Sequence, residues 1–401
     1  MKILYICNKS PWPPVEGGTI GMYNFITKIA DAGNDVKVLA ANTNKYFVNP
    51  DEVPEDFKNK TKFELEYIDL SIKPVDAFFN LFTKKSYHVR RFISKAFEKK
   101  LVDILKNNTF DIVQIEYLYM SPYLDIVRKY SDAKVVLRAH NIEHLIWKRA
   151  AREEKNPLKK FYLKHLATTL ELFERSVLNK YDGIVPVTAK DAEFFKKNSK
   201  VPVTDAPFSI DTEKFSEYYN PDPEHALFHI GSMNWLPNEE GIKWFVKKVW
   251  PLVTKKHNNL KLYLAGREMP KWLIDIKQKN LEIVGEVPDA YEFIGSKSIL
   301  VAPLFSGSGI RVKIIESMAL GKAVISTTIG AEGINYTDGK DIVIADTADE
   351  FANAITKLYS DKQETKRLGQ NALKLIKEQH DITKVIEKLE HFYQELLNNR
   401  N

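Results

Sequence analysis

Short apolar runs alternate with amphipathic segments along the whole chain. The apolar runs have the length of buried strands, and the segments between them repeat apolar residues at helical spacing. The predicted strands lie at residues 2–7, 36–40, 64–68, 112–115, 134–138 and 183–186, and again at 226–230, 261–265, 281–284, 298–302, 323–326 and 341–344. The predicted helices include 21–32, 90–106, 158–180, 238–256, 310–320, 349–360 and 382–397. Continuous apolar strands that alternate with helices predict an α/β fold, with parallel sheets covered by helices on both faces.

The alternation forms two series, which a proline-rich stretch at 201–223 separates. We therefore expect two Rossmann-like, doubly wound domains that face each other across a cleft. The expected boundaries are 1–205 for the N-terminal domain, 206–380 for the C-terminal domain, and 381–401 for a last helix that packs back on the N-terminal domain. Ligands of such folds bind at the carboxyl ends of the strands, so the predicted site lies in that cleft.

The composition is that of an ordinary globular protein, with 44% hydrophobic and 28% charged residues in a chain of 401. No apolar run reaches the ~18–20 residues of a membrane span, and the run at the N-terminus is too short for a secretory signal. The single cysteine, Cys7, cannot form an internal disulfide, which favours a cytoplasmic localisation. The net charge of +6 suits an anionic ligand or an anionic membrane surface, but it is too small to indicate nucleic-acid binding.

The most informative segment is glycine-rich and lies between two predicted strands, at residues 305–326. It begins with a short run of small residues and cations, Gly307-Ser308-Gly309-Ile310-Arg311-Val312-Lys313. The glycines allow backbone amides to approach a ligand oxyanion, and Ser308 is predicted to cap the helix. Arg311 and Lys313 fall in the predicted first turn, where cations are unfavourable by a few tenths to about 1 kcal/mol unless an anion binds there.

Two further features favour a nucleotide ligand. Glu316 follows the two cations on the predicted helix, and a carboxylate can accept hydrogen bonds from both hydroxyls of a ribose. Gly17 and Gly18 follow the first strand and begin a helix, where backbone amides can approach a phosphate. The order of these glycines does not match the dinucleotide fingerprint, and no acidic residue ends the second strand, so a Rossmann-type dinucleotide cofactor is not predicted.

The stretch from Glu316 to Ile325 resembles the donor-nucleotide motif of the family 4 retaining glycosyltransferases, which have the GT-B fold. Segments 17–18, 207–215 and 228–231 are also similar to that family, and the resemblance covers nearly the whole chain. It implies a nucleotide diphosphate sugar as donor and retention of the anomeric configuration. The candidate catalytic residues are His140, Arg311, Lys313 and Glu316, and the candidate donor-binding residues are Gly17, Gly18, Gly231, Arg267, Gly307, Ser308, Gly309 and Ile310.

The chain departs from the family pattern in two ways. The family often carries a glutamate eight positions before the one matched by Glu316, and Ser308 occupies that position here. The family also tends to place an arginine and a lysine after the first strand of the C-terminal domain, and the stretch 231–241 contains no cation. Because a diphosphate leaving group needs compensating charge, we expect Arg311 and Lys313 to have taken over this role, with Arg267 as a third contributor.

His140 follows an apolar strand, at the position where the resemblance implies a histidine that contacts the donor sugar. A neutral imidazole there can bond a sugar hydroxyl or the acceptor. His144 lies four residues later, but no further ligand cluster accompanies the two histidines, so we expect no metal and no other cofactor. A histidine within a strand is more often packed than reactive, and His229 is therefore given no catalytic role.

Two stretches combine cations with aromatic residues, at 78–92 and 147–162. Such stretches can contact an anionic membrane surface, although they can equally be solvated helix faces with core aromatics. In the family, the N-terminal half that holds them binds the acceptor, which is often lipid-linked or a growing polysaccharide. No recognised nucleic-acid-binding motif is present.

These observations predict a retaining glycosyltransferase that moves a sugar from a nucleotide diphosphate sugar to a glycan or lipid-linked acceptor in surface polysaccharide synthesis. The protein is expected to be cytoplasmic, with peripheral contact at the inner face of the membrane as a further hypothesis. Two alternatives stay open, namely a sugar-nucleotide epimerase of the same architecture and a non-catalytic nucleotide-sugar- or glycan-binding protein. An epimerase would need an acid/base pair, and no second carboxylate is obvious in the sequence.

Overall fold

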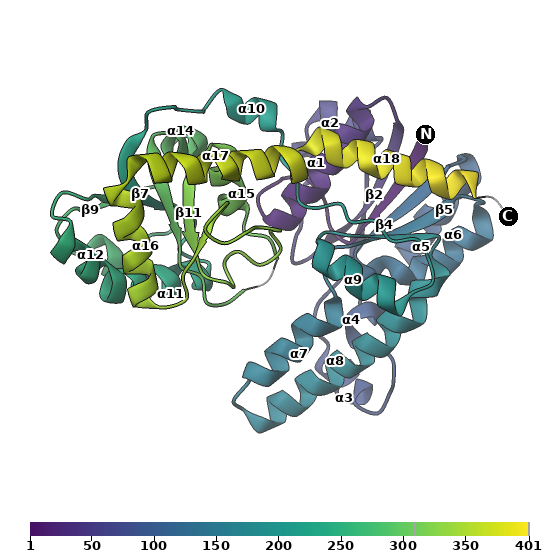
Figure 1. The fold of residues 1–401 in the computed structure, drawn as a ribbon. Helices are drawn as coiled ribbons and strands as arrows, with labels where there is room; N and C mark the ends of the chain where they lie inside the picture. The colour runs from purple at the N-terminus through teal and green to yellow at the C-terminus, as the bar shows by residue number, and fades with distance from the viewer. Residues whose placement is uncertain (308, 400–401) are drawn as a thin grey trace. The chain divides into compact units, whose positions relative to one another are not determined.

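The chain forms two compact units in a computed structural model that describes residues 1–307 and 309–399. Unit 1 consists of Met1–Phe208 and Val385–Asn401, and unit 2 of Ser209–Lys384 (Figure 1). The chain therefore passes from one unit to the other twice, at residues 208–209 and at residues 384–385.

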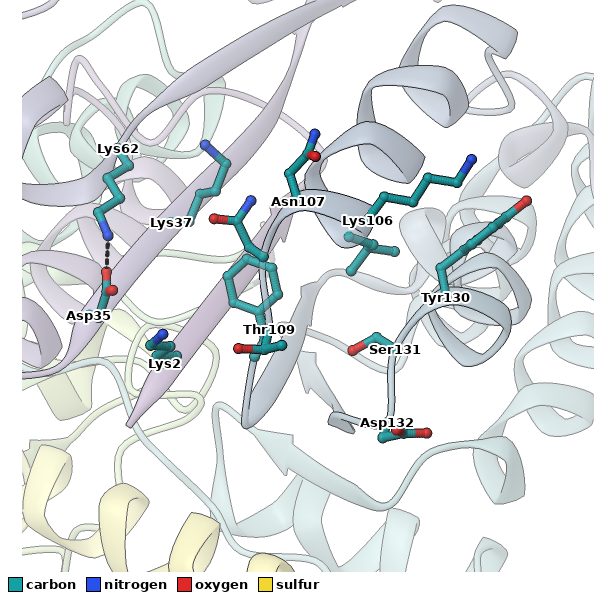
Figure 2. Close-up of a pocket in the computed structure, with 13 residues that line it drawn as sticks. Lys2, Asp35, Lys37, Lys62, Lys106, Asn107, Thr109, Tyr130, Ser131 and Asp132 are labelled. Carbon is teal, nitrogen blue, oxygen red and sulfur yellow. Dashed lines mark hydrogen bonds and ion pairs between the residues drawn. The ribbon is translucent and has the colours of Figure 1, made fainter.

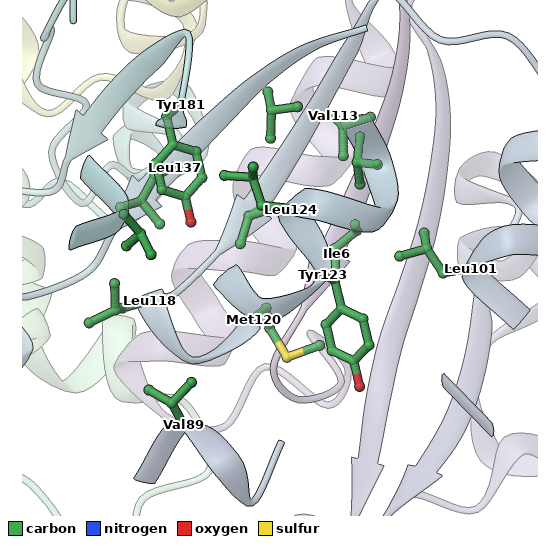
Figure 3. Packing of buried hydrophobic residues seen from close by; sticks show 14 of the residues in the cluster. Ile6, Val89, Leu101, Val113, Leu118, Met120, Tyr123, Leu124, Leu137 and Tyr181 are labelled. Carbon is green, nitrogen blue, oxygen red and sulfur yellow. The ribbon is translucent and has the colours of Figure 1, made fainter. Parts of the chain in front are cut away.

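Unit 1 is built on a parallel sheet of six strands in the order β3-β2-β1-β4-β5-β6. The strands are β1 (Lys2–Cys7), β2 (Asp35–Thr43), β3 (Glu64–Ile68), β4 (Ile112–Glu116), β5 (Lys134–Ala139) and β6 (Gly183–Pro186). Every residue of the central strand β4 is buried, because side chains on both faces of the sheet are covered. Figure 3 shows part of the resulting core, in which Ile6, Val113 and Leu137 from the sheet lie among residues such as Leu118 and Leu124.

The helices of unit 1 connect these strands and cover the sheet. They are α1 (Gly17–Asp31), η1 (Pro50–Glu52), α2 (Glu55–Thr61), α3 (Pro74–Asn80), α4 (Tyr87–Arg90), α5 (Lys95–Asn107), η2 (Leu118–Tyr123), α6 (Leu124–Tyr130), α7 (Glu143–Glu153), α8 (Pro157–Val177), η3 (Leu178–Lys180) and α9 (Ala189–Asn198). In Figure 1, α7 and α8 lie alongside one another as a long helical pair with α3 beside it.

The last helix, α18 (Ile382–Asn398), begins in unit 2 and continues into unit 1. Within unit 1 its Tyr393 hydroxyl donates a hydrogen bond to Gln114 of β4, and Asn34 donates one of 2.6 Å to Glu390. Gly183 in β6 leaves room for this helix, since a Cβ there would lie 2.8 Å from the ring of Phe392. Among the described residues, no helix is long and apolar enough to cross a membrane.

Unit 2 repeats the same design with a second parallel sheet of six strands, in the order β12-β11-β10-β7-β8-β9. Its strands are β7 (Glu224–Ile230), β8 (Leu262–Ala265), β9 (Leu281–Gly285), β10 (Lys297–Ala302), β11 (Ala323–Ser326) and β12 (Val343–Ile344). Its helices are α10 (Thr212–Ser216), α11 (Leu236–Trp244), η4 (Phe245–Val249), α12 (Trp250–Lys256), α13 (Lys271–Ile274), α14 (Ala290–Gly295), α15 (Val312–Ala319), α16 (Ala348–Ser360) and α17 (Lys362–Gln379).

Read in chain order, both sheets follow the doubly wound order 3-2-1-4-5-6. Each sheet therefore has a switch point between its first and fourth strands, β1 and β4 in unit 1 and β7 and β10 in unit 2. The connections after these two strands leave in opposite directions, which opens a crevice at the carboxyl ends of the strands where ligands bind. The α/β class and the two parallel sheets predicted from the sequence are confirmed.

Three predicted helices differ from the structure. The helix expected at 90–106 is divided into α4 and α5, and Ser94 caps the second of these by accepting a hydrogen bond from the Phe97 amide. The helix expected at 238–256 contains a π-helical turn, η4, because Pro251 lacks the amide that the regular helical ladder needs. The helix expected at 310–320 begins only at Val312.

A close backbone contact in unit 2 requires a glycine at residue 241. Gly241 lies in α11, and a Cβ at this position would be 1.8 Å from the carbonyl oxygen of Pro303, just after β10. The contact brings α11, which follows β7, against the connection that follows β10. It therefore helps to define the switch point of this sheet.

We predict that Gly241→Ala lowers the free energy of unfolding of unit 2 by about 1–3 kcal/mol or more, because the backbone of Pro303 must move to make room. Thermal and urea unfolding followed by circular dichroism measure this loss. The matched control is Gly21→Ala in α1, where the nearest atom to a Cβ is 3.8 Å away. There alanine should be neutral or stabilising, since it is the better helix former. Equal losses in both variants would contradict the proposed contact.

Candidate active site

The glycine-rich loop of unit 2 follows β10 at the switch point and has the conformation that requires glycine. Gly307 and Gly309 have φ values of 101° and 79°, in the left-handed region that other residues rarely adopt. Gly307 also lies against Trp235, since a Cβ there would be 3.0 Å from the indole ring. Ser308, the predicted helix cap, lies outside the described residues.

Arg311 precedes helix α15 and is not in its first turn, which corrects the expected position. Its extended backbone, with φ −89° and ψ 93°, places it at the N-cap position, and Ile310 lies just before it, half-buried. The guanidinium is buried, donates a hydrogen bond to the Gly309 carbonyl, and lies 5.6 Å from the centre of the Trp235 ring. Burial lowers the pKa of Arg311 below its ordinary value.

Lys313 is held by two side chains from the other half of the switch point. Its Nζ donates hydrogen bonds to Asn238 Oδ1 at 2.8 Å and to His229 Nε2 at 3.1 Å. His229 can accept at Nε2 because its Nδ1 donates to the Val301 carbonyl at 2.8 Å, which leaves a lone pair on the other ring nitrogen. His229 is fully buried, as expected for a packed strand histidine, but it also orients this lysine.

The ammonium of Lys313 lies at the carboxyl end of β7, although residues 231–241, which follow that strand, contain no cation. A Cβ at Gly231 would be only 2.5 Å from Nζ, so the glycine is the residue that admits the lysine. Burial lowers the pKa of Lys313 to about 7, and the nearby charge of Arg311 adds to this effect. The structure thus brings together Gly231, Lys313 and Arg311, three of the residues predicted from the sequence.

Glu316 lies on the same helix and is held by Tyr291. The Tyr291 hydroxyl donates a hydrogen bond of 3.2 Å to Glu316 Oε1, and the Tyr291 ring packs on Phe215 with 4.7 Å between the ring centres. Burial raises the pKa of Glu316 to about 7, although Tyr291 and Lys313 each favour the charged form. Phe215 belongs to the segment 207–215 whose pattern was noted in the sequence, and it supports the tyrosine that orients the carboxylate.

Arg267 follows the neighbouring strand β8, directly after Gly266, where a Cβ would lie 1.9 Å from the Gly231 carbonyl oxygen. Its side chain is exposed, and its backbone carbonyl accepts a hydrogen bond of 2.9 Å from the Met233 amide. Within residues 1–307 and 309–399, the structure gives its guanidinium no hydrogen bond or ion pair. The contact that the structure gives between the expected third cation and the segment after β7 is this backbone hydrogen bond.

Unit 1 has its own group of polar residues at the carboxyl ends of β1, β4 and β5. Gly17 and Gly18 begin α1, and Glu16 before them caps the helix reciprocally with Thr19. A Cβ at Gly18 would lie 2.7 Å from the Tyr117 hydroxyl and 3.3 Å from Lys9 Nζ. Gly18 therefore leaves its backbone accessible next to a cation and a phenol.

His140, after β5, lies in this group. Its ring stacks on Tyr117 with 3.8 Å between the ring centres, and its Nε2 is 2.6 Å from Glu116 Oε2. Burial lowers the pKa of His140, which outweighs the opposite effect of Glu116. The imidazole is therefore neutral near pH 7, the form that can accept a hydrogen bond from a hydroxyl.

His144 belongs to a different cluster. It is buried and pairs through Nδ1 with Glu174, while its Nε2 is 3.6 Å from Glu171. Among the described residues, no group of three or more histidine, cysteine, aspartate or glutamate side chains is arranged to hold a metal ion.

Several residues of these two groups were not predicted as site residues from the sequence, notably Glu116, Tyr117, Asn238 and Tyr291. A weak signal existed for Glu116, since it is an acidic residue that directly continues an apolar strand. Asn238 and Tyr291 offer no such signal, because they lie in ordinary amphipathic segments.

The residues predicted from the sequence do not line the cavity of about 460 Å³ that Figure 2 shows. Lys2, Asp35 and Thr109 place this cavity at the amino ends of the unit 1 strands. Lys62, which also lines it, is paired with Asp35. In an α/β sheet this is the end opposite to the one where ligands bind.

Comparison with known proteins gives a family match for most of unit 2 and similar folds for the whole chain. Residues 224–361 match the family model described as "Glycosyl transferases group 1". A protein from Klebsiella pneumoniae, described as an uncharacterized 44.6 kDa protein in a cps region, is 24% identical over 97% of this chain and 98% of its own length. The fold is similar to sucrose-phosphate synthase from Thermosynechococcus elongatus, with a TM-score of 0.67, 13% identity and coverage of 99% of this chain and 100% of the other.

A third similar structure is HepE from Anabaena, solved in complex with UDP. It has a TM-score of 0.63 and 10% identity, and the match covers 98% of this chain and 100% of HepE. The matched family model spans the whole cluster of Lys313, Glu316 and the glycine-rich loop. Residues 224–361 thus match the group 1 glycosyltransferases, and the whole chain has two parallel α/β sheets arranged as in structures of the GT-B fold.

Proposed function

We propose that this enzyme transfers a sugar from a UDP-sugar to a glycan or lipid-linked acceptor, with retention of the anomeric configuration. The observation that carries the proposal is the position of Lys313. Its ammonium lies against Gly231 at the end of β7, and its backbone belongs to the same helix as Glu316. A cation at a strand end, a glycine-rich loop and a carboxylate form a combination suited to a diphosphate joined to a ribose.

In this proposal, unit 2 binds the donor nucleotide. Lys313 and Arg311, with the backbone amides of Gly307 and Gly309, stabilise the charge that develops on the departing diphosphate. Glu316, oriented by Tyr291, accepts hydrogen bonds from the ribose hydroxyls. Because Ser308 stands where the family often has a glutamate, the sugar itself is contacted differently in this chain.

The reaction breaks the bond between the anomeric carbon and the diphosphate oxygen, and it forms a bond from that carbon to the acceptor oxygen on the same face. The leaving phosphate oxygen takes the proton of the acceptor hydroxyl, so no protein base is needed. The enzyme contributes position and electrostatic stabilisation. Unit 1 binds the acceptor, and His140 orients the sugar or the acceptor, while the backbone around Gly17 and Gly18 contacts the diphosphate.

The similar proteins support the proposed donor nucleotide and the proposed product. HepE was solved with UDP and with UDP-glucose, which supports a uridine nucleotide for the donor here. The relative from Klebsiella pneumoniae is described by its place in a cps region, which supports a role in the synthesis of a surface polysaccharide such as a capsule.

A sugar-nucleotide epimerase of the same architecture is the alternative enzyme. An epimerase needs an acid/base group, and the buried Glu143, whose pKa burial raises to about 7, is one carboxylate that could supply it. Glu143 accepts a hydrogen bond from Tyr119 and lies near a second carboxylate, Glu174. Incubation with UDP-sugars separates the three functions. UDP release with an acceptor indicates transfer, interconverted sugar nucleotide indicates epimerisation, and binding without turnover indicates a binding protein.

We also propose that unit 1 contacts an anionic membrane surface through α3 and α8. Phe78, Phe79 and Phe82 at the end of α3 are 59%, 63% and 76% exposed, and Leu158 and Phe161 on α8 are 81% and 66% exposed. The two elements meet where His165 Nε2 donates to the Asn80 carbonyl at 3.0 Å, one turn from Phe161. Exposed cations flank both, namely Lys84, Lys85, Arg152, Lys155 and Lys159.

Arg311→Ala and Lys313→Ala should each lower the rate of UDP release from the donor by about 10²–10³-fold, because each removes a charge that stabilises the leaving group. Steady-state kinetics measure the loss, and circular dichroism checks that the fold is intact. The control is Arg367→Ala, which removes an exposed arginine paired with Glu364 on α17 of the same unit. Near-normal rates in both site variants would refute the role of these cations.

Binding of UDP should take up protons at about pH 8, because Lys313, with a pKa of about 7, is mostly neutral there and the diphosphate raises this pKa. Isothermal titration calorimetry in buffers of different ionisation enthalpy measures the uptake. Lys313→Met should abolish the uptake, and persistent uptake in that variant would assign the proton to another group.

The triple variant Phe78→Ser, Phe79→Ser and Phe82→Ser should lose most of its binding to vesicles, because it removes three exposed apolar side chains from the proposed contact. Cosedimentation with vesicles rich in phosphatidylglycerol measures this binding. Phosphatidylcholine vesicles should bind the unaltered protein weakly. Phe47→Ser, which removes an equally exposed phenylalanine elsewhere in unit 1, should bind normally. If the unaltered protein does not cosediment with the anionic vesicles, the proposed membrane contact is wrong.

A further inference from the structure

We propose that Glu116 is a positioning residue for His140, and that the C-terminal helix α18 sets its orientation through a buried hydrogen-bond chain from Tyr393 to Gln114 to Glu116. The inference rests on the proposed function in one respect, namely that His140 contacts the sugar or the acceptor. These three residues and His140 all belong to unit 1.

The first link fixes the tautomer of His140. The pKa of Glu116 is lowered because the charge of Arg138 and the hydrogen bonds from His140 and Gln114 outweigh the cost of burial, so this carboxylate is ionised. An ionised carboxylate can only accept hydrogen bonds, so the contact of 2.6 Å requires a proton on His140 Nε2. In the neutral imidazole, Nδ1 then carries a lone pair and is the atom that can accept a hydrogen bond from a hydroxyl.

The position of His140 leaves this lone pair usable. The ring stacks on Tyr117, which fixes its plane, and 9% of the side chain remains exposed. No residue of the described part of unit 1 donates a hydrogen bond to Nδ1. The arrangement therefore presents one acceptor atom in a fixed direction, which suits a sugar or acceptor hydroxyl.

The second link orients Glu116 from the other side. Gln114 Nε2 donates a hydrogen bond of 2.6 Å to Glu116 Oε1, and the Tyr393 hydroxyl donates to Gln114 Oε1. Because the ionised Glu116 can only accept, the nitrogen of the Gln114 amide must face it, and the Tyr393 hydroxyl donates to the oxygen that points the other way. A residue of the last helix thus helps to hold the Gln114 amide in this orientation, although it lies 279 positions away in the chain.

The position of Arg138 explains why Glu116 needs the hydrogen bonds that Gln114 and Tyr393 make. This arginine is buried, its guanidinium carbon lies 3.5 Å from the centre of the Phe25 ring, and its Nη1 is 3.9 Å from Glu116 Oε1. Its positive charge lowers the pKa of His140 and supports the ionised form of Glu116. A buried carboxylate between a cation and an imidazole needs several hydrogen bonds to hold one geometry, and Gln114 supplies one of them.

The direct test is the tautomer of His140, read from long-range ¹H–¹⁵N correlation spectra of protein with labelled histidine. In the unaltered protein, Nε2 should carry the proton. In Glu116→Gln, the new amide oxygen should face Gln114 and its NH₂ group should face His140, which forces the proton onto Nδ1. In the double variant Glu116→Gln with Tyr393→Phe, Gln114 is free to rotate, so a measurable share of the original tautomer should return.

Two matched controls accompany the spectra. Glu174→Gln alters another buried glutamate–histidine pair and should change the signals of His144 but not those of His140. Tyr181→Phe removes a buried hydroxyl that bonds Ser121 at 2.5 Å, and it should leave the His140 signals unchanged. Tyr393→Phe alone keeps the ring and the charge of Glu116, so it tests the chain even if Glu116→Gln unfolds. It should broaden or split the His140 signals.

Kinetics with UDP-glucose as the donor supply a second readout. Glu116→Gln should lower kcat/KM by about tenfold, the size of one misdirected hydrogen bond. In a His140→Ala background the same substitution should have no further effect, because the two residues act as one unit. If His140→Ala alone leaves the rate normal, the role of His140 in the proposed function is wrong, while the tautomer spectra still test the positioning.

Two results would overturn the inference. One is a proton on Nδ1 of His140 in the unaltered protein. The other is an unchanged His140 tautomer in folded Glu116→Gln together with unchanged His140 signals in Tyr393→Phe. Additive losses of kcat/KM in the His140→Ala background would assign Glu116 a merely structural role.

Discussion

The contact of Lys313 with His229 and Asn238 is the interaction on which the candidate donor site depends. A lysine ammonium at the carboxyl end of a strand is costly to bury, and here two acceptors at 3.1 Å and 2.8 Å hold it in place. His229 can accept only because its other nitrogen donates to Val301 on the neighbouring strand β10. The sheet itself therefore orients the cation, and a bound diphosphate would supply the missing negative charge.

The same region of unit 2 is where the sequence departs from the pattern of the family that it resembles. Where the family tends to place cations after β7, this sequence has Gly231 and Asn238, and the lysine comes from the helix after β10. Strands β7 and β10 pair directly, so a cation from either side of the switch point reaches the same place. Gly231 leaves the space that the lysine occupies, since a Cβ at that position would lie 2.5 Å from the lysine Nζ.

Unit 1 uses burial in a different manner. Burial, with a smaller contribution from Arg138, keeps the imidazole of His140 neutral, and the buried carboxylate of Glu116 orients it through a hydrogen bond. Gln114 and Tyr393 complete the hydrogen bonding of this group, so the last helix of the chain contributes to the surroundings of a loop after β5. In both units, buried polar groups orient the few side chains that are placed to meet a ligand.

The sequence by itself determined the class of the fold and most of its strands. Apolar runs bounded by polar residues place β1, β6 and β11 at the predicted residues, because a strand buried on both faces must be apolar throughout. The edge strand β3 also lies at the predicted residues, although it is only partly buried. The glycine-rich loop and the cations 311 and 313 were also visible, since their positions depend on local backbone and charge. The helix boundaries at 94 and 312 were not, because a cap and an extended residue decided them. Only the tertiary structure brought His229 and Asn238 to Lys313, Tyr291 to Glu316, and Tyr393 to Gln114, since each of these contacts joins residues from different strands and helices that only the packed fold brings together.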